Sequence, residues 1–494
     1  MRKTWILCLL FLPMFAMANN NYKFSEDHRT AYELIIAMRF DEAQDLIKKI
    51  KRDQPEDLLV YHIENYIDFI SIFISEEKDE FKAKEPNKDI RLAKLKQGDA
   101  NDPYFLFSQA EVHLQWAMTR IKFEEYFSAA LEVNKAIGML EENQNRFPNF
   151  ISNKKSLSIL HAVAGTIPDK YKGVIELVSN FNGTIDQGLL EIEEVLAYSK
   201  HNDYFFEKEA VAIKAMILLH LKNKKEDSWN FLSTSSISRE DNPMATFLLA
   251  STAMNCGRNE EAIKILKKRT RSPRYFPFYY LDLMLGTAKL SRMDKDADVY
   301  IKSYIHNFQG KDYFKDAYRK LAWHALTIMD NEKGYLGYME LCERVGNANI
   351  DEDKSALKEA KKKTVPHRKL LKARLLYDGG YLSDAQAELE SIDHGDLTSE
   401  ENIEFLYRKA RVQHNMKNID QALIFYKNCL SMCGDSKLYY CSNSALQMGI
   451  IYEEKNEIEE ARVFYERCLS MNSSEYNNSL HQKAKSGLTR IRKR

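Results

Sequence analysis

The chain is short of the residues that interrupt helices. Glycine occurs 18 times and proline 10 times in 494 residues, against typical shares of about 7% and 5%. Sheet-rich folds with many tight turns need more of both residues. Lysine, glutamate, leucine and alanine are abundant instead. The composition therefore predicts an all-α protein rather than an all-β or α/β one.

Neither sign of charge is in excess, because 72 basic residues balance 72 acidic ones. Binding to a phosphate backbone needs a clustered basic excess, so the charge gives no indication of a nucleic-acid partner. The sequence also lacks a His-Glu-x-x-His helix, a Gly-x-Ser-x-Gly elbow, a phosphate loop and a Gly-x-Gly-x-x-Gly turn. These absences argue against an enzyme, and we expect no catalytic residue, no metal site and no cofactor.

The long apolar stretch of the sequence lies at its N-terminus. Arg2 and Lys3 precede an apolar run over residues 5–15, and Ala-Met-Ala follows at 16–18. This order is typical of a cleavable secretory signal, and the run is too short to span a bilayer comfortably. We expect a signal peptide over 1–18, cleavage after Ala18, and a periplasmic or secreted protein. No later stretch predicts a transmembrane helix.

Six of the seven cysteines follow the expected signal. An oxidising compartment permits disulfides, but a core of this size does not need them. Cys433 and Cys441 flank a short Gly-Asp-Ser turn, which a disulfide would bridge. The alternative is that both are free cysteines, which pack as small buried apolar residues.

A fixed spacing of small and large residues recurs along the chain. Its clearest copy consists of Gly449, Tyr452, Ala461, Tyr465 and Cys468. Copies begin at 373, 410 and 449, so they are 37 and 39 residues apart, and the spacing also fits segments that begin at 250 and 31. Small residues on facing surfaces let two antiparallel helices approach closely. The spacing therefore predicts a series of helix hairpins.

This spacing resembles the tetratricopeptide repeat. The resemblance implies about ten to twelve antiparallel helix pairs, several of them degenerate, that wind into a superhelix with a concave inner face. The segment 104–142 is expected to form two unusually long helices. The sequences around 156–190, 374–381 and 483–490 show a weaker likeness to the tetratricopeptide-repeat-39 family and related bacterial proteins.

Composition suggests five segments. After the signal, we expect N-terminal repeat-like helices over 19–150, a glycine-rich irregular helical segment over 151–200, central repeats over 201–350 and C-terminal repeats over 351–494. Four glycines fall between 165 and 188. They are interpreted as turns and close helix packing, with a ligand-binding loop as the alternative.

Candidate partner-binding residues follow from the repeat register. In the tetratricopeptide repeat the first helix of each pair lines the concave side, and Arg374 and Arg411 come directly after its small position. Helical spacing adds Tyr377, Tyr407 and His414 to the same faces. Modules of this family that bind an acidic chain end use cations at such positions. The resemblance thus implies a peptide-binding groove, with an ordinary polar groove as the alternative.

We therefore expect an exported, non-enzymatic scaffold or adaptor that binds another protein, in envelope assembly or transport. The alternative is a glycan-binding helical protein of the cell envelope, although sugar sites favour tryptophan and only 4 occur. Basic runs over 358–372 and 483–494 suggest either peripheral association with an anionic envelope surface or ordinary solvated helix faces.

Overall fold

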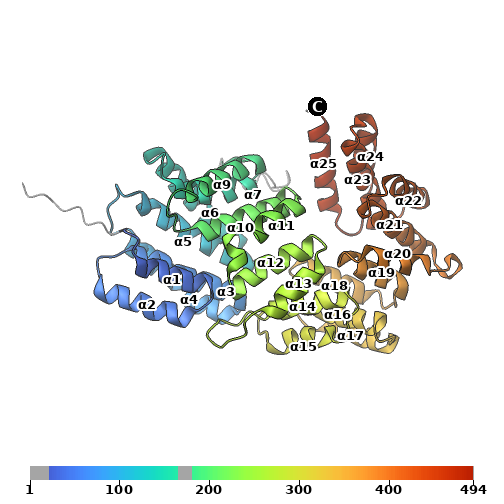
Figure 1. Ribbon diagram of the computed structural model, residues 1–494, viewed down its shortest axis with the longest axis horizontal. Coiled ribbons are helices and arrows are strands. Elements are labelled where there is room, and N and C mark those ends of the chain that lie inside the picture. The colour runs from blue at the N-terminus through green and yellow to red at the C-terminus, as the bar shows by residue number, and fades with distance from the viewer. Residues whose placement is uncertain (1–21, 165–180, 493–494) are drawn as a thin grey trace, which may run out of the picture. The chain divides into compact units, whose positions relative to one another are not determined.

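The computed structural model describes residues 22–164 and 181–492. These residues form 24 α-helices and no β-strand (Figure 1). The all-α prediction is confirmed, and the number of helices agrees with the expected ten to twelve pairs. The expected signal peptide and residues 165–180 of the glycine-rich segment lie outside the described residues.

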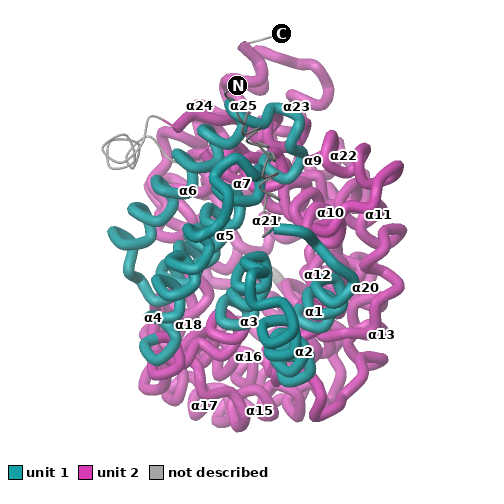
Figure 2. The backbone as a smooth tube through the Cα atoms, turned by 90° about the vertical axis from the view of Figure 1, so that its left-hand side faces the viewer, with its two compact units in different colours: residues 1–35, 39–70, 82–153 teal, residues 36–38, 71–81, 154–494 magenta. Residues whose placement is uncertain are grey.

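The chain divides into two compact units (Figure 2). Unit 1 consists of residues 1–35, 39–70 and 82–153, and unit 2 of residues 36–38, 71–81 and 154–494. Unit 1 contains all or most of six helices. They are α1 (Glu26–Ile36), α2 (Phe40–Asp53), α3 (Leu59–Ser75), α4 (Lys78–Leu95), α5 (Pro103–Lys122) and α6 (Tyr126–Arg146).

Unit 2 contains the remaining helices. Its first part consists of α7 (Ile151–Ala164), α9 (Ile185–Ser199), α10 (Glu207–Met216), α11 (Lys225–Ser233), α12 (Pro243–Asn255), α13 (Asn259–Lys268), α14 (Tyr280–Ser291) and α15 (Ala297–Asn307). Its second part consists of α16 (Phe314–Thr327), α17 (Glu332–Arg344), α18 (Asp351–Lys361), α19 (Arg368–Asp378), α20 (Leu382–Glu390), α21 (Ser399–Asn415), α22 (Ile419–Met432), α23 (Tyr439–Glu454), α24 (Ile458–Ser470) and α25 (Asn477–Arg492).

Unit 2 is built mainly from helix hairpins. Turns of three to five residues join α12 to α13, α14 to α15, α16 to α17, α19 to α20, α21 to α22 and α23 to α24. The first helices of successive hairpins also contact one another: α19 contacts α21, and α21 contacts α23. The last helix, α25, packs on both α23 and α24.

The repeat spacing has a direct steric cause at the C-terminal end. A side chain on Gly449 of α23 would place its Cβ 2.7 Å from the ring of Tyr465, and a side chain on Gly487 of α25 would collide with the same ring. Tyr465 is completely buried and its hydroxyl donates a hydrogen bond to Glu453 at 2.6 Å. Two glycines thus let two helices close on one aromatic ring of α24.

The long helices expected over 104–142 are present. Helix α5 has 20 residues and α6 has 21. Proline at the first position suits the start of α5, because that residue needs no intrahelical donor. The Asp102 side chain accepts a hydrogen bond from the backbone N–H of Tyr104, which caps this helix start.

One contact of unit 2 joins hairpins that are not neighbours in sequence. Gly257 in the α12–α13 turn and Gly380 in the α19–α20 turn meet backbone to backbone, both with positive φ (69° and 84°). The Tyr381 hydroxyl donates to Glu260 at 2.7 Å and accepts from Asn259 at 3.1 Å. Repeats in a simple solenoid contact only their neighbours. Unit 2 therefore departs from a strictly linear stack.

Candidate functional site

The five predicted partner-binding residues lie on two consecutive first helices of unit 2. Arg374 and Tyr377 belong to α19, and Tyr407, Arg411 and His414 belong to α21. These two helices pack against each other. The repeat register therefore places all five residues within one small part of the molecule, although their roles differ.

Arg411 and Tyr377 form the direct link between the two helices. Nε and Nη2 of Arg411 donate to the Tyr377 hydroxyl at 3.0 and 2.8 Å, and Asn415 donates to the same oxygen at 2.9 Å. The guanidinium carbon also lies 5.5 Å from the centre of the Tyr377 ring. Within residues 22–164 and 181–492, no carboxylate pairs with Arg411.

Arg374 lies against an indole from the preceding part of unit 2. Its guanidinium carbon is 4.8 Å from the ring centre of Trp323 on α16, and that of Arg319 is 4.7 Å from the same ring. The indole N–H donates to Glu359 at 2.8 Å, which fixes the ring. Nε of Arg374 lies 3.7 Å from a carboxylate oxygen of Asp378 and the side chain keeps 28% of its surface exposed. Arg374 therefore retains capacity for another partner.

Tyr407 orders its neighbours rather than facing solvent. It is only 6% exposed, and its hydroxyl accepts a hydrogen bond from Asn443 of α23 at 2.6 Å. Its ring centre lies 5.1 Å from that of Tyr440 and 5.9 Å from that of Tyr439. Tyr407 thus supports a group of three tyrosines between α21 and α23.

Arg408 shares a helix with Arg411 but has its own counter-ion. Nε of Arg408 donates to Glu404 at 2.6 Å, one helical turn away. Burial opposes ionisation of Glu404, but the adjacent Arg408 outweighs it and lowers the pKa of that carboxyl. The guanidinium carbon lies 5.7 Å from the Tyr440 ring centre. The charge of Arg408 is therefore neutralised within the helix.

His414 is a neutral member of the site. Its Nδ1 lies 3.4 Å from the hydroxyl oxygen of Tyr426. Burial, together with the positive charges of Arg411 and Lys417, lowers the pKa of His414 to about 4. The imidazole is therefore uncharged at neutral pH and contributes hydrogen bonding instead of charge.

Seven of the side chains on α16, α19, α21 and α23 are named together the first-helix strip. The strip consists of Trp323, Arg374, Tyr377, Arg408, Arg411, Tyr439 and Tyr440. Sequence reasoning missed four of them. Arg408 was detectable, because it lies one turn before Arg411 on the same helix face. Trp323 was missed, because the repeat register placed its candidates on two later first helices, α19 and α21.

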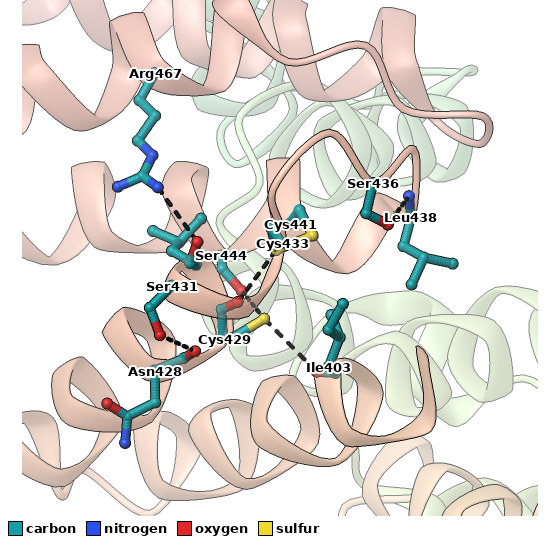
Figure 3. Close-up of a disulfide and its surroundings, with 11 residues drawn as sticks. Ile403, Asn428, Cys429, Ser431, Cys433, Ser436, Leu438, Cys441, Ser444 and Arg467 are labelled. Atoms are coloured by element: carbon teal, nitrogen blue, oxygen red, sulfur yellow. Dashed lines mark hydrogen bonds between the residues drawn. A yellow bond between two sulfur atoms is a disulfide. The ribbon is translucent and has the colours of Figure 1, made fainter. Parts of the chain in front are cut away.

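A disulfide joins Cys433, directly after α22, to Cys441 in the first turn of α23, with their Cα atoms 6.0 Å apart (Figure 3). It fastens the turn between two hairpins of the strip. The nearby Cys429 is a free, buried thiol that receives a hydrogen bond from Ser444 at 3.3 Å. Burial raises the pKa of Cys429 to about 11, so this thiol stays protonated at neutral pH.

The described residues contain neither a candidate metal centre nor a helix able to cross a membrane. Within 22–164 and 181–492, no three histidine, cysteine, aspartate or glutamate side chains gather in a way that would hold a metal ion. Among the helices of the same residues, none has the length and apolar character needed to cross a membrane.

A family model described as tetratricopeptide repeat matches residues 403–436 and 442–475. The chain contains tetratricopeptide repeats. The two matches correspond to the α21–α22 and α23–α24 hairpins, so the family predicted from the spacing is confirmed. The narrower likeness to the tetratricopeptide-repeat-39 family is not confirmed.

Solved structures similar to this chain include a TPR domain and a hetero-tetramer of the APC/C. The P58(IPK) TPR domain is 15% identical, with 86% of this chain and 99% of that chain covered and a TM-score of 0.22. The Cut9–Hcn1 hetero-tetramer of the APC/C is 12% identical, with 95% of this chain and 94% of that chain covered and a TM-score of 0.29. At these TM-scores neither likeness carries an argument. No curated protein matches the sequence.

Proposed function

We propose that this protein is a non-enzymatic scaffold or adaptor that binds an acidic polypeptide segment along the first-helix strip. Tetratricopeptide repeats typically bind protein partners, which supports the general part of the proposal. The strip supports the finer part, because it combines aromatic rings with guanidinium groups on adjacent first helices.

The observation that carries the proposal is that only one of two arginines on α21 has a carboxylate counter-ion. Arg408 has Glu404 as its counter-ion, whereas the hydrogen-bond partner of Arg411 is a tyrosine hydroxyl. A partly buried cation without a counter-ion is costly. A carboxylate from a bound peptide would supply it through a charge-assisted hydrogen bond. Arg374 on the neighbouring helix would take a second acidic side chain.

Export remains part of the proposal. The basic head, the short apolar run and the Ala-Met-Ala end of residues 1–18 support secretion, and a role in envelope assembly or transport would follow from it. Mass determination of the purified protein from its native cells tests this directly. A chain that begins at Asn19 is the expected result, and a chain that retains residues 1–18 would contradict export through this signal.

Peptide binding is tested by fluorescence anisotropy with a labelled glutamate-rich peptide and a lysine-rich peptide of equal length. We expect binding of the acidic peptide alone. Arg411→Gln should weaken it about tenfold or more, because a charge-assisted hydrogen bond contributes about 1.5–3 kcal/mol. Lys417→Gln is the matched control, since this exposed cation lies on the turn after α21. Equal affinity for Arg411→Gln and the wild type would contradict the proposal.

A glycan-binding function is the second candidate. Its support is the tyrosine group of the strip, in which the Tyr439 and Tyr440 ring centres lie 4.3 Å apart and Asn443 provides a neighbouring amide. Retardation in a polysaccharide-containing gel distinguishes the two functions. Retardation that Tyr439→Ala abolishes and Arg411→Gln leaves unchanged would favour the glycan.

A further inference from the structure

The turn between α5 and α6 in unit 1 exposes an unusual set of large apolar side chains. The exposed fractions are 75% for Phe127, 64% for Tyr126, 50% for Ile121, 49% for Met118 and 42% for Leu131. We name these five residues the α5–α6 patch. None of them belongs to the first-helix strip, and the tetratricopeptide matches do not include them.

The five residues lie near one end of the α5–α6 hairpin. Met118 and Ile121 lie one turn apart near the end of α5, and Phe127 and Leu131 lie one turn apart at the start of α6. The two helices pack against each other as a hairpin, so the four residues gather at the same end. Phe127 and Tyr126 alone expose roughly 300 Å², given 150–250 Å² for a large aromatic side chain. Patches of about 300–600 Å² on a monomer are often functional.

A glycine on the same helix adds an independent observation. Gly138 lies two turns beyond Leu131 on α6, and no atom lies within 4 Å of the position its Cβ would take. Glycine inside a helix is less stable than alanine by roughly 0.5–1 kcal/mol. Nothing within the described residues requires a glycine here. The close approach of a further molecule to this face of α6 would require it.

The charge beside the patch fits a second copy of the same surface. Lys135 is exposed and forms no ion pair within the described residues, and the ring of Phe127 contacts no cation or aromatic ring there. Phe127 and Lys135 each lie four residues from Leu131, on opposite sides. If two α6 helices cross antiparallel at Leu131, Phe127 of each copy meets Lys135 of the other. In that arrangement the Lys135 ammonium of one copy and the Phe127 ring of the other form a cation–π contact.

We propose that two copies of this chain associate through the α5–α6 patch, about a two-fold axis that passes near Leu131. Such an interface is isologous, so one apolar surface is complementary to itself. Gly138 of each copy then faces the α5–α6 turn of the other, which explains the missing side chain. A stable dimer buries about 800 Å² per partner. The patch provides the apolar centre, and Lys135 belongs to the polar rim.

Sedimentation velocity of the full chain over a range of concentrations tests the proposal. The wild type should sediment as a dimer. Leu131→Glu should weaken association about 100-fold or more, because it places two carboxylates together at the axis. Val463→Glu is the matched control, since Val463 on α24 is 59% exposed and lies outside the patch. It should remain dimeric, and circular dichroism should show unchanged helix content in both variants.

A cross-linking experiment tests the position of the axis. Leu131→Cys should form a disulfide-linked dimer on mild oxidation, whereas Val463→Cys should not. A monomeric wild type at about 100 μM, or a Leu131→Glu variant that dimerises like the wild type, would overturn the proposal. A monomeric wild type that co-sediments with phosphatidylcholine–phosphatidylglycerol vesicles and loses this on Leu131→Glu would also overturn it, in favour of a lipid surface.

Discussion

The two ends of the chain hold their helices together by different means. Around α23, α24 and α25 a tyrosine ring packs against glycines, as Tyr465 does against Gly449 and Gly487. Around α3–α6 the contacts are buried charges. Glu132 of α6, only 4% exposed, accepts from Lys88 at 2.7 Å and contacts Nδ1 of His113 at 2.5 Å. One fold class therefore uses two kinds of interior.

The charged interior of unit 1 is extensively paired. Arg91 of α4 donates to Asp68 at 2.6 Å and to the Asn65 side chain at 3.0 Å. Asn65 also accepts from the Trp116 indole at 3.1 Å and donates to Gln115 at 2.6 Å. Such a network is stable only while its members keep their partners. It should therefore tolerate truncation far less well than a surface ion pair does.

The largest expected effect is loss of the Glu132 carboxylate, which contacts both Lys88 and His113 in the charged interior of unit 1. Glu132→Ala leaves Lys88 and His113 buried without their partner, which should destabilise the protein by about 3–5 kcal/mol. Thermal unfolding followed by circular dichroism measures it. Lys48→Ala removes an exposed ion pair with Asp45 in the same unit and should cost under about 0.5 kcal/mol. Equal effects of the two substitutions would contradict the contrast between the buried charges around Glu132 and an exposed ion pair.

Acid should affect Glu132 of unit 1 and Asp353 of unit 2 in opposite directions. Burial opposes ionisation of Glu132, but hydrogen bonds from His113 and Lys88 outweigh it and lower the pKa of Glu132 to about 2. Its stabilisation is present above its unfolded pKa of about 4.5 and is lost as pH falls towards 2. Burial raises the pKa of Asp353 in unit 2 to about 6. Its stabilisation is complete below about 3.8 and is lost as pH rises through 6.

Hydrogen exchange at pH 7, 5 and 3 measures this difference. From pH 7 to 5, amides of α16 should gain protection, because protonation of Asp353 removes the cost of burying its charge. Asp353 contacts the start of this helix, where the backbone N–H groups of Tyr313 and Asp316 donate to it at 2.7 and 2.9 Å. From pH 5 to 3, amides of α5 and α6 should lose protection first. Asp353→Asn should remove the change in α16. Protection of α16 that falls between pH 7 and 5 would be inconsistent with these pKa directions.

A smaller effect on the free energy of unfolding distinguishes glycines packed against a neighbouring side chain from glycines with open space beside them. Gly449→Val forces a branched side chain against the Tyr465 ring and should destabilise by about 1–3 kcal/mol. Gly337→Ala introduces a methyl group into open space on α17 and should stabilise the protein by about 0.5–1 kcal/mol. Chemical denaturation of both variants gives the two signs. Destabilisation of similar size in both would show that the repeat spacing has no special role.

The sequence predicted the parts of the fold that depend on local spacing. The C-terminal hairpins were recognisable because Gly449 and Tyr465 lie within one repeat, and Arg374 and Arg411 followed from the same register. The network around Glu132 was not predictable, since its members come from different helices and each resembles an ordinary surface charge. The division into segments at 150, 200 and 350, the signal and export stay predictions.

The most direct test of the central claim is hydrogen exchange of the full chain with and without the glutamate-rich peptide. Acidic segments should bind where Arg411 lacks a carboxylate partner. Peptide-dependent protection should therefore appear in α19, α21 and α23, disappear in Arg411→Gln, and be absent from α3–α6. Protection confined to the charged helices of unit 1, or retained in full by Arg411→Gln, would contradict binding along the first-helix strip.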